Sequence, residues 1–140
     1  MGGSSGAELR ALVLSGANNH DWRATTPEIV QQLEATGLFD VDVTENPAML
    51  SAAEIAQYNV LVSNYNGPDW SNVTRRAVLE YLSEGGGIVI IHAADNPFPG
   101  WREFESLIGV AWRDGAGHGT YHRFMVTIDK RPNPVLAGIP

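Results

Sequence analysis

Short apolar runs alternate with amphipathic stretches along most of the chain, and polar loops separate them. Short apolar runs are typical of strands, whereas apolar residues at helical spacing are typical of helices. Strands are predicted at 10–15, 38–44, 58–64 and 88–91. Because a helix is predicted between each pair of consecutive strands, the connections indicate right-handed crossovers and a parallel sheet. The predicted fold class is therefore α/β, a flavodoxin-like three-layer sandwich with a mostly parallel central sheet.

The predicted helices begin at residues that can cap them. Thr25 or Thr26 is expected to cap the first helix, because Pro27 then falls in its first turn. Ser51 and Ser71 are expected to cap the second and third helices in the same way.

The pattern becomes less regular after the fourth strand. A short helix is predicted at 101–108, and a further strand at 121–128, where apolar and polar residues alternate. Residues 1–7 are interpreted as a flexible leader or tag, which leaves 8–140 as one domain. Because such a sheet leaves an edge to cover, we expect the natural domain to continue past Pro140. The chain would then be a C-terminally truncated form of it.

The amino-acid composition excludes several classes of ligand and of site. Apolar residues make up 44% of the 140 residues, which is enough for a packed core. The net charge of −7 argues against nucleic acid and against an anionic membrane surface, since both need clustered Lys and Arg. The absence of cysteine excludes disulfides, thiolate nucleophiles and cysteine-based zinc sites. The glycines at 85–87 precede a strand, so they end a helix and do not cradle a phosphate.

Polar loops follow three of the predicted strands. In open parallel sheets, ligands bind beyond the carboxyl ends of the strands, where these loops gather. This edge of the sheet is therefore the predicted site. The candidate residues in or beside these loops are Asn19, His20, Asp21, Trp22, Asn64, His92, Asp95 and Trp101.

His92 directly follows the apolar run of the fourth strand, so we expect it to be held rigidly and to be partly buried. That position suits a general base, a metal ligand or a hydrogen-bond donor to a sugar hydroxyl. The plainer interpretation is a histidine that satisfies loop carbonyls. His20 and Asp21 have the same two interpretations, an acid–base pair or a loop that binds its own backbone.

A metal site is a further hypothesis. His118 and His122 are four residues apart, which would suit two ligands on a helix, but the glycines around His118 argue against a helix there. His20, His92 and His118 come from separate loops and could together hold a divalent metal such as zinc. The sequence leaves their convergence open.

The tryptophans suggest a class of ligand. Each lies in or beside a loop that follows a strand, and each alone is most simply explained as packing. Together with the neighbouring Asn, Asp and His residues they resemble the lining of a carbohydrate site, with Trp22 as a stacking platform. A small carbohydrate is therefore the predicted partner.

Several motifs resemble those of ThuA-like (trehalose utilisation) domains. The run 14–27 contains Asn-His-Asp-Trp-Arg-Ala-Thr-Thr-Pro and resembles the opening of these domains, and 85–94 resembles their central strand and turn. The runs 116–119, 124–128 and 133–140 resemble the segment that follows. The family is similar in fold to class I glutamine amidotransferases, whose nucleophilic cysteine lies in the turn after this strand. Here that turn holds His92 and no cysteine, which excludes amidotransferase chemistry by a thiolate.

The resemblance implies a bacterial protein of sugar metabolism, cytoplasmic or periplasmic, that acts on a disaccharide, a glucoside or a 3-keto derivative. It implies catalytic roles for His20, His92 and Asp21. The sequence departs from the family pattern at Asn133, where the family usually has His, and it lacks the family's later acidic segment and last strand. A non-catalytic carbohydrate-binding or regulatory module, an inactive fragment, and a homodimer that completes its sheet with a second chain remain alternatives.

Overall fold

The computed structural model describes residues 9–128 and 131–137. The predicted leader, 1–7, lies outside the described residues. Four parallel strands form the sheet in the order β2-β1-β3-β4. The strands are β1 (Leu9–Leu14), β2 (Phe39–Thr44), β3 (Val60–Ser63) and β4 (Gly87–Ile90).

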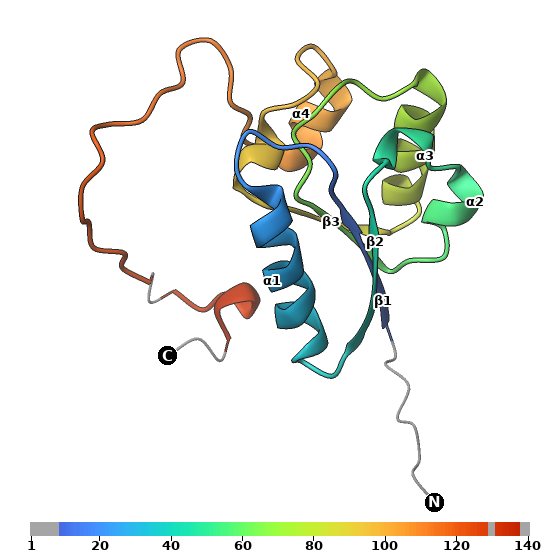
Figure 1. The fold of residues 1–140 in the computed structure, drawn as a ribbon, viewed down its shortest axis with the longest axis horizontal. Helices are drawn as coiled ribbons and strands as arrows, with labels where there is room; N and C mark the ends of the chain where they lie inside the picture. The colour runs from blue at the N-terminus through green and yellow to red at the C-terminus, as the bar shows by residue number, and fades with distance from the viewer. Residues whose placement is uncertain (1–8, 129–130, 138–140) are drawn as a thin grey trace, which may run out of the picture.

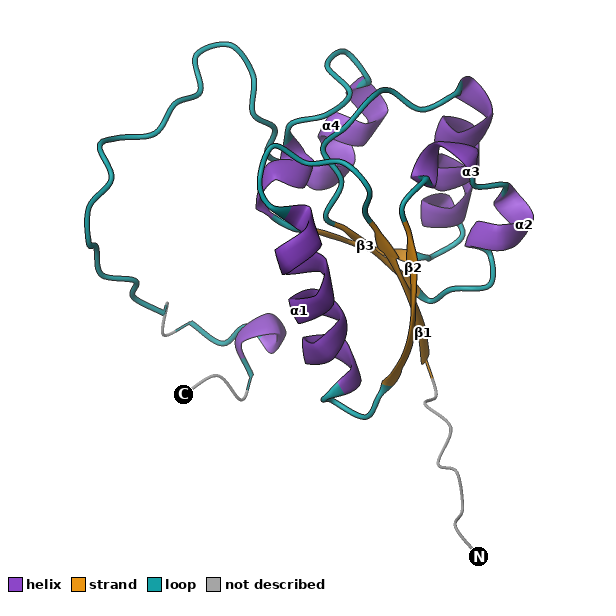
Figure 2. Cartoon of the chain, viewed as in Figure 1, coloured by secondary structure: helices purple, strands orange, loops and turns teal. Residues whose placement is uncertain are grey.

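Helices cover both faces of the sheet (Figures 1 and 2). α1 (Trp22–Glu34) covers one face, while α2 (Ala52–Ile55), α3 (Asn72–Ser83) and α4 (Arg102–Ile108) contribute to the core on the other. The strand order and the three layers confirm the predicted flavodoxin-like α/β fold. Within the described residues, no helix is long and apolar enough to cross a membrane.

The two faces of the sheet are covered to different extents. On the α1 face, Val43, Val13, Val62 and Val89 form one row across the four strands. Val13 and Val62 are buried, at 0% and 3% exposure, whereas Val43 and Val89 on the outer strands are 45% and 46% exposed. α1 therefore covers the middle of its face and leaves both edges in contact with solvent.

On the opposite face, an aromatic cluster closes the carboxyl end of the core. Trp70 lies against Phe98 with ring centroids 4.6 Å apart, and Trp101 stacks on Phe104 at 5.0 Å. All four side chains are at most 5% exposed. Aromatic pairs of this kind contribute about 0.5–1.5 kcal/mol each beyond the area that they bury. The cluster therefore anchors the segment that follows β4.

Two predicted helix caps are confirmed. Ser51 forms a reciprocal capping box with Glu54 at the start of α2, and the Ser71 side chain accepts a hydrogen bond from the Thr74 amide at the start of α3. The predicted cap of α1 is wrong, because the Asp21 carboxylate accepts the Ala24 amide and starts the helix at Trp22. Pro27 then falls inside the helix.

The predicted strand at 121–128 is also wrong. This segment belongs to no sheet, and its side chains are exposed, with Tyr121 at 101% and Met125 at 89%. Alternation favours a strand only where a neighbouring strand supplies hydrogen-bond partners, and none lies beside this segment in the described part of the chain. A short 3-10 helix, Pro134–Leu136, follows.

Candidate functional site

His20 and His92 come together above the carboxyl end of the sheet. His20 lies in the loop between β1 and α1, and His92 begins the turn after β4. Their ring centroids are 4.9 Å apart and their planes are inclined by 39°. The predicted site therefore unites two loops that are far apart in the sequence. Both side chains are exposed, so the expected partial burial of His92 is wrong.

His92 has an unusual backbone conformation. Its φ is +36°, in the left-handed region that few residues other than glycine adopt. It opens a 3-10 turn, His92–Asp95, in which Ala93 and Ala94 are buried at 2% and 0% exposure. Such a conformation costs about 1–3 kcal/mol and persists only where the surroundings impose it. Here it occurs together with the burial of Ala93 and Ala94, and the His92 side chain is left exposed beside His20.

Side-chain amides hold the His20 loop to the loop that follows β3. Asn18 accepts a hydrogen bond from the His20 backbone N–H at 2.9 Å, and its own side-chain N–H₂ donates to the Asn64 carbonyl at 2.9 Å. Asn19 accepts a bond from the Asn66 side chain at 2.7 Å. The loops after β1 and β3 are therefore tied together beneath His20.

A buried polar network lies below this loop. The hydroxyls of Ser15 and Thr26 are 2.7 Å apart, and the Asn64 side chain donates to Thr25 and Thr26, at 3.0 Å in each case. Ser15, Thr26 and Asn64 are at most 7% exposed. Because buried polar groups are costly unless paired, the network fixes α1 relative to β1 and β3. The Asn64 amide serves this network, and its predicted substrate contact stays a prediction.

Arg113 holds the turn that carries His92. Its guanidinium donates to the carbonyls of Asn96 at 2.8 Å and Pro97 at 3.2 Å, and it pairs with Glu105 at 2.6 Å. The Arg113 guanidinium lowers the pKa of the Glu105 carboxyl. Arg113 is not predicted from the sequence, because it lies in an irregular segment and no local motif links it to the turn.

The other predicted residues occupy different settings. The Asp21 carboxylate accepts the Ala24 amide at the start of α1, and Asp95 is partly buried in the turn after β4. Trp22 is partly buried, and the Arg23 guanidinium lies 4.1 Å from its ring centroid. Trp101 is 4% exposed and packs in the aromatic core. Its surface available to a ligand is therefore small, and the predicted contact stays a prediction.

His118 does not join the histidine pair within the described part of the chain. Its ring lies 5.7 Å from that of Trp112, in the segment after α4. No group of three His, Asp or Glu side chains that could hold a metal occurs among the described residues. His20 and His92 therefore supply two imidazoles, one fewer than the three protein ligands of a catalytic zinc site.

A groove lies between α1 and the edge strand β2, and Trp22, two residues after His20, is among the residues that line it. Its volume is about 390 Å³, within the range of sites for small ligands. Trp22 and Val43 give it apolar surface, while Gln31, Glu34 and Glu45 add polar groups. This combination of an indole with amide and carboxylate groups suits a sugar ring.

Comparisons with known proteins agree on one family. A model of the ThuA family, described as trehalose utilisation, matches residues 10–140. The chain is similar to a solved ThuA-like protein from Parabacteroides merdae ATCC 43184, with 36% identity and a TM-score of 0.69 over 77% of this chain and 40% of that one. A ThuA-like protein from Bacteroides uniformis ATCC 8492, at 20% identity and a TM-score of 0.60 over 76% and 45%, has the same fold. No curated protein matches the chain.

Proposed function

Because the chain belongs to the ThuA (trehalose utilisation) family, we propose that it acts on a disaccharide, a glucoside or a 3-keto derivative of one. His20 and His92 are the proposed acid–base pair. The observation that carries the proposal is their approach to 4.9 Å between ring centroids at the ligand-binding edge of the sheet. The chain spans 40% and 45% of the lengths of the two solved relatives. The activity of the whole protein is therefore proposed and does not follow from the family alone.

The proposed chemistry is proton transfer. Imidazole serves as a general base when neutral and as a general acid when protonated. With two imidazoles side by side, one can remove a proton from the sugar while the other donates one to an oxygen of the same ligand. A keto group favours the first transfer, because it makes the neighbouring C–H more acidic. The chain contains no cysteine, so none of these steps uses a thiolate.

The groove lined by Trp22 is the proposed place for the rest of the sugar. Arg23 covers one face of the Trp22 indole, so a stacked sugar ring would use the opposite face. Gln31, Glu34 and Glu45 are available for its hydroxyls. A disaccharide or glucoside could then place one ring at the histidines and the remainder in the groove.

A divalent metal such as zinc stays a proposal. His20 and His92 would be two of its ligands, and a third would have to come from elsewhere, with His118 as the predicted candidate. The proton transfers above use the imidazoles alone. Elemental analysis of protein purified without a metal-affinity column tests this branch. Stoichiometric zinc in the wild type that is lost in His20→Asn would establish the metal site, whereas metal-free wild-type protein would exclude it.

A carbohydrate-binding module without catalysis is the second candidate. The exposure of both histidines favours it, because catalytic sites commonly exclude water from the reacting groups. Under this alternative, the pair and the groove would recognise sugar hydroxyls by hydrogen bonding. The two candidates share the same site and differ only in turnover.

A panel of disaccharides, glucosides and their 3-keto derivatives separates the candidates. We expect His92→Ala to lower turnover by about 10²–10⁴-fold, the usual contribution of a general acid or base. His122→Ala is the matched control, because that exposed ring contacts Thr120 and Phe124 and lies outside the pair. Calorimetric binding without turnover would support the module instead. Neither binding nor turnover by the wild type would overturn both.

A further inference from the structure

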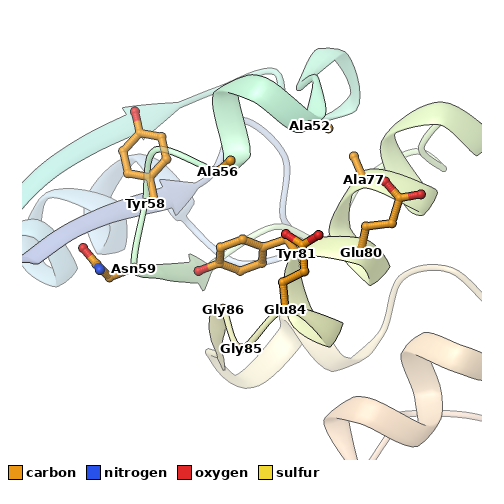
Figure 3. Close-up of a pocket in the computed structure, with 10 residues that line it drawn as sticks. All are labelled: Ala52, Ala56, Tyr58, Asn59, Ala77, Glu80, Tyr81, Glu84, Gly85 and Gly86. Carbon is orange, nitrogen blue, oxygen red and sulfur yellow. The ribbon is translucent and has the colours of Figure 1, made fainter.

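A second cavity lies at the opposite end of the sheet from the histidine pair. It is bounded by α2, by α3 and by the residues that precede β3 and β4 (Figure 3). Its volume is about 390 Å³, again within the range of small-ligand sites. Nothing in the proposed sugar chemistry uses this cavity.

One aromatic wall of the cavity is fixed by the local sequence. Tyr81 is 8% exposed, and its hydroxyl donates to the Gly87 carbonyl at 3.2 Å. Gly86 lies directly against the ring, because a Cβ at this position would come within 2.2 Å of it. The Tyr81 ring is therefore held in place, and its hydroxyl already has a hydrogen-bond partner.

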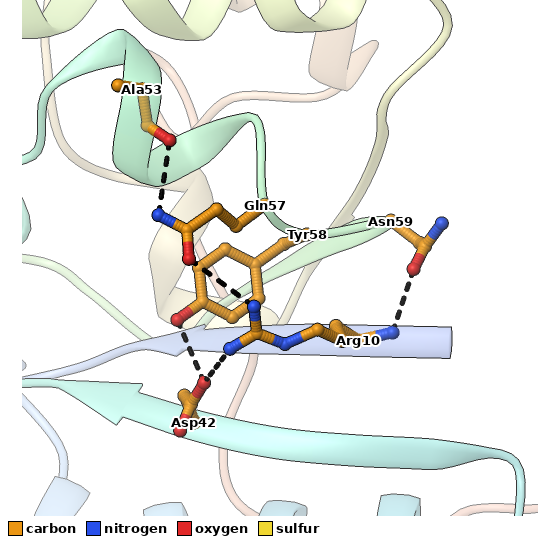
Figure 4. Close-up of polar contacts among 6 residues, drawn as sticks. All are labelled: Arg10, Asp42, Ala53, Gln57, Tyr58 and Asn59. Atoms are coloured by element: carbon orange, nitrogen blue, oxygen red, sulfur yellow. Dashed lines mark hydrogen bonds and ion pairs between the residues drawn. The ribbon is translucent and has the colours of Figure 1, made fainter. Parts of the chain in front are cut away.

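The second aromatic wall is held by an ion pair (Figure 4). The Tyr58 hydroxyl donates to Asp42 at 2.9 Å, and the Arg10 guanidinium lies 4.7 Å from the ring centroid. Arg10 in turn pairs with Asp42 at 2.7 Å. Because Asp42 already balances the positive charge of Arg10, Arg10 does not neutralise the negative charges that line the cavity.

The cavity itself carries two negative charges. Glu80 in α3 and Glu84, the C-cap of that helix, lie four residues apart, and both line this space (Figure 3). Like charges at this spacing repel each other. Among the described residues, no Lys, Arg or His lies within ion-pair distance of either carboxylate. The small side chains of Ala52, Ala56 and Ala77 leave the space between these charges and the tyrosines open.

We propose that this cavity binds an organic cation with a short aliphatic chain, of the diamine class. The ammonium groups pair with Glu80 and Glu84, and the methylene groups lie against the alanines and the tyrosine rings. A hard metal ion fits less well, because it needs about six oxygen ligands. Here two carboxylates face apolar and aromatic walls, and both tyrosine hydroxyls are bonded elsewhere.

Calorimetric titration with 1,4-diaminobutane tests the proposal. The wild type is expected to bind, and Glu80→Gln combined with Glu84→Gln is expected to weaken binding by about tenfold, a typical effect of losing two exposed ion pairs. Glu28→Gln combined with Glu103→Gln is the matched control. It removes the same charge from exposed positions outside the cavity and should leave the affinity unchanged. Ala56→Leu should weaken binding by filling the cavity without changing its charge.

Three outcomes would overturn the proposal. One is the absence of diamine binding to the wild type. Another is equal weakening in both charge variants, which would indicate a general attraction to an acidic protein. The third is binding of Mg²⁺ at the glutamates with no binding of the diamine. Thermal unfolding of each variant confirms that it is folded, and the charge variants alone decide the question if Ala56→Leu does not fold.

Discussion

The two histidines of the site are held by neighbourhoods of different chemistry. Beneath His20, neutral amides and hydroxyls of Ser15, Thr26 and Asn64 form a buried network. Beyond His92, the turn is held by the aromatic core and by the partly exposed guanidinium of Arg113.

The difference shows how one site can depend on unlike forces. A neutral buried network does not titrate and is little affected by salt, whereas an ion pair near the surface is weakened by both acid and salt. Because the first support lies beneath the His20 loop and the second holds the His92 turn, the approach of the two rings depends on both. Variants can therefore disturb one side of the site and leave the other in place.

The largest effect is expected in the aromatic core on the His92 side. Phe98 is 3% exposed and packs against Trp70, so Phe98→Ala is expected to lower the free energy of unfolding by about 3–5 kcal/mol. Phe124→Ala is the control, because Phe124 is 73% exposed and its loss should change stability by at most about 0.5 kcal/mol. Urea unfolding measures both. Equal effects would contradict the packing described here.

The next effect tests the support of His20. Asn64→Ala removes the donor to Thr25 and Thr26 and should cost about 1–3 kcal/mol of unfolding free energy, since buried partners are left unpaired. Asn72→Ala, at an exposed position in α3, is the control. Hydrogen exchange should increase in the loop after β1 and remain unchanged in the turn after β4. The reverse pattern would show that the two supports are not separate.

A smaller effect is expected from the support of His92. Arg113→Met removes the donors to the Asn96 and Pro97 carbonyls and should cost about 1 kcal/mol, because the guanidinium is partly exposed. Hydrogen exchange should rise in the turn after β4. Arg76→Met, at an exposed position of the same charge, should change neither stability nor exchange. Unchanged hydrogen exchange in this turn of Arg113→Met would show that Arg113 does not position the turn.

The smallest effect is one of pH. Arg113 lowers the pKa of Glu105, so the contribution of this pair is present above the ordinary Glu pKa and is lost as the pH falls through the lowered value. On acidification, the wild type should therefore lose more stability than Arg113→Met does. Asn64→Ala should follow the wild type, because its network has no titrating group. Parallel pH profiles for the wild type and Arg113→Met would contradict this account.

Much of the fold follows from local pattern. The strands are continuous apolar runs, and predicted positions such as 10–15 and 88–91 agree with β1 and β4 to within about a residue, the usual precision of such boundaries. The rule that polar loops gather at the carboxyl end of a parallel sheet predicted the edge at which the site lies. The sequence left open whether the histidines meet, and the structure brings His20 and His92 to 4.9 Å between ring centroids.

The failures share a physical cause. The segment 121–128 has the alternation of a strand, but alternation cannot tell whether a partner strand is present. The start of α1 was misplaced because Asp21 and Thr26 are both good caps, and only the buried contact with Ser15 shows that Thr26 serves another purpose. Arg113 was missed because its partners are distant in the sequence. Each depends on tertiary contacts that one segment does not encode.

The central claim is that His20 and His92 act as one unit on a sugar. A double-mutant cycle on turnover of a 3-keto-glucoside, with His20→Asn, His92→Asn and the double variant, tests it most directly. Each single variant should lose about 10²-fold or more, and the double variant should lose little further, because groups that act as a unit are not additive. Losses that multiply in the double variant, or a single variant with undiminished turnover, would contradict the account.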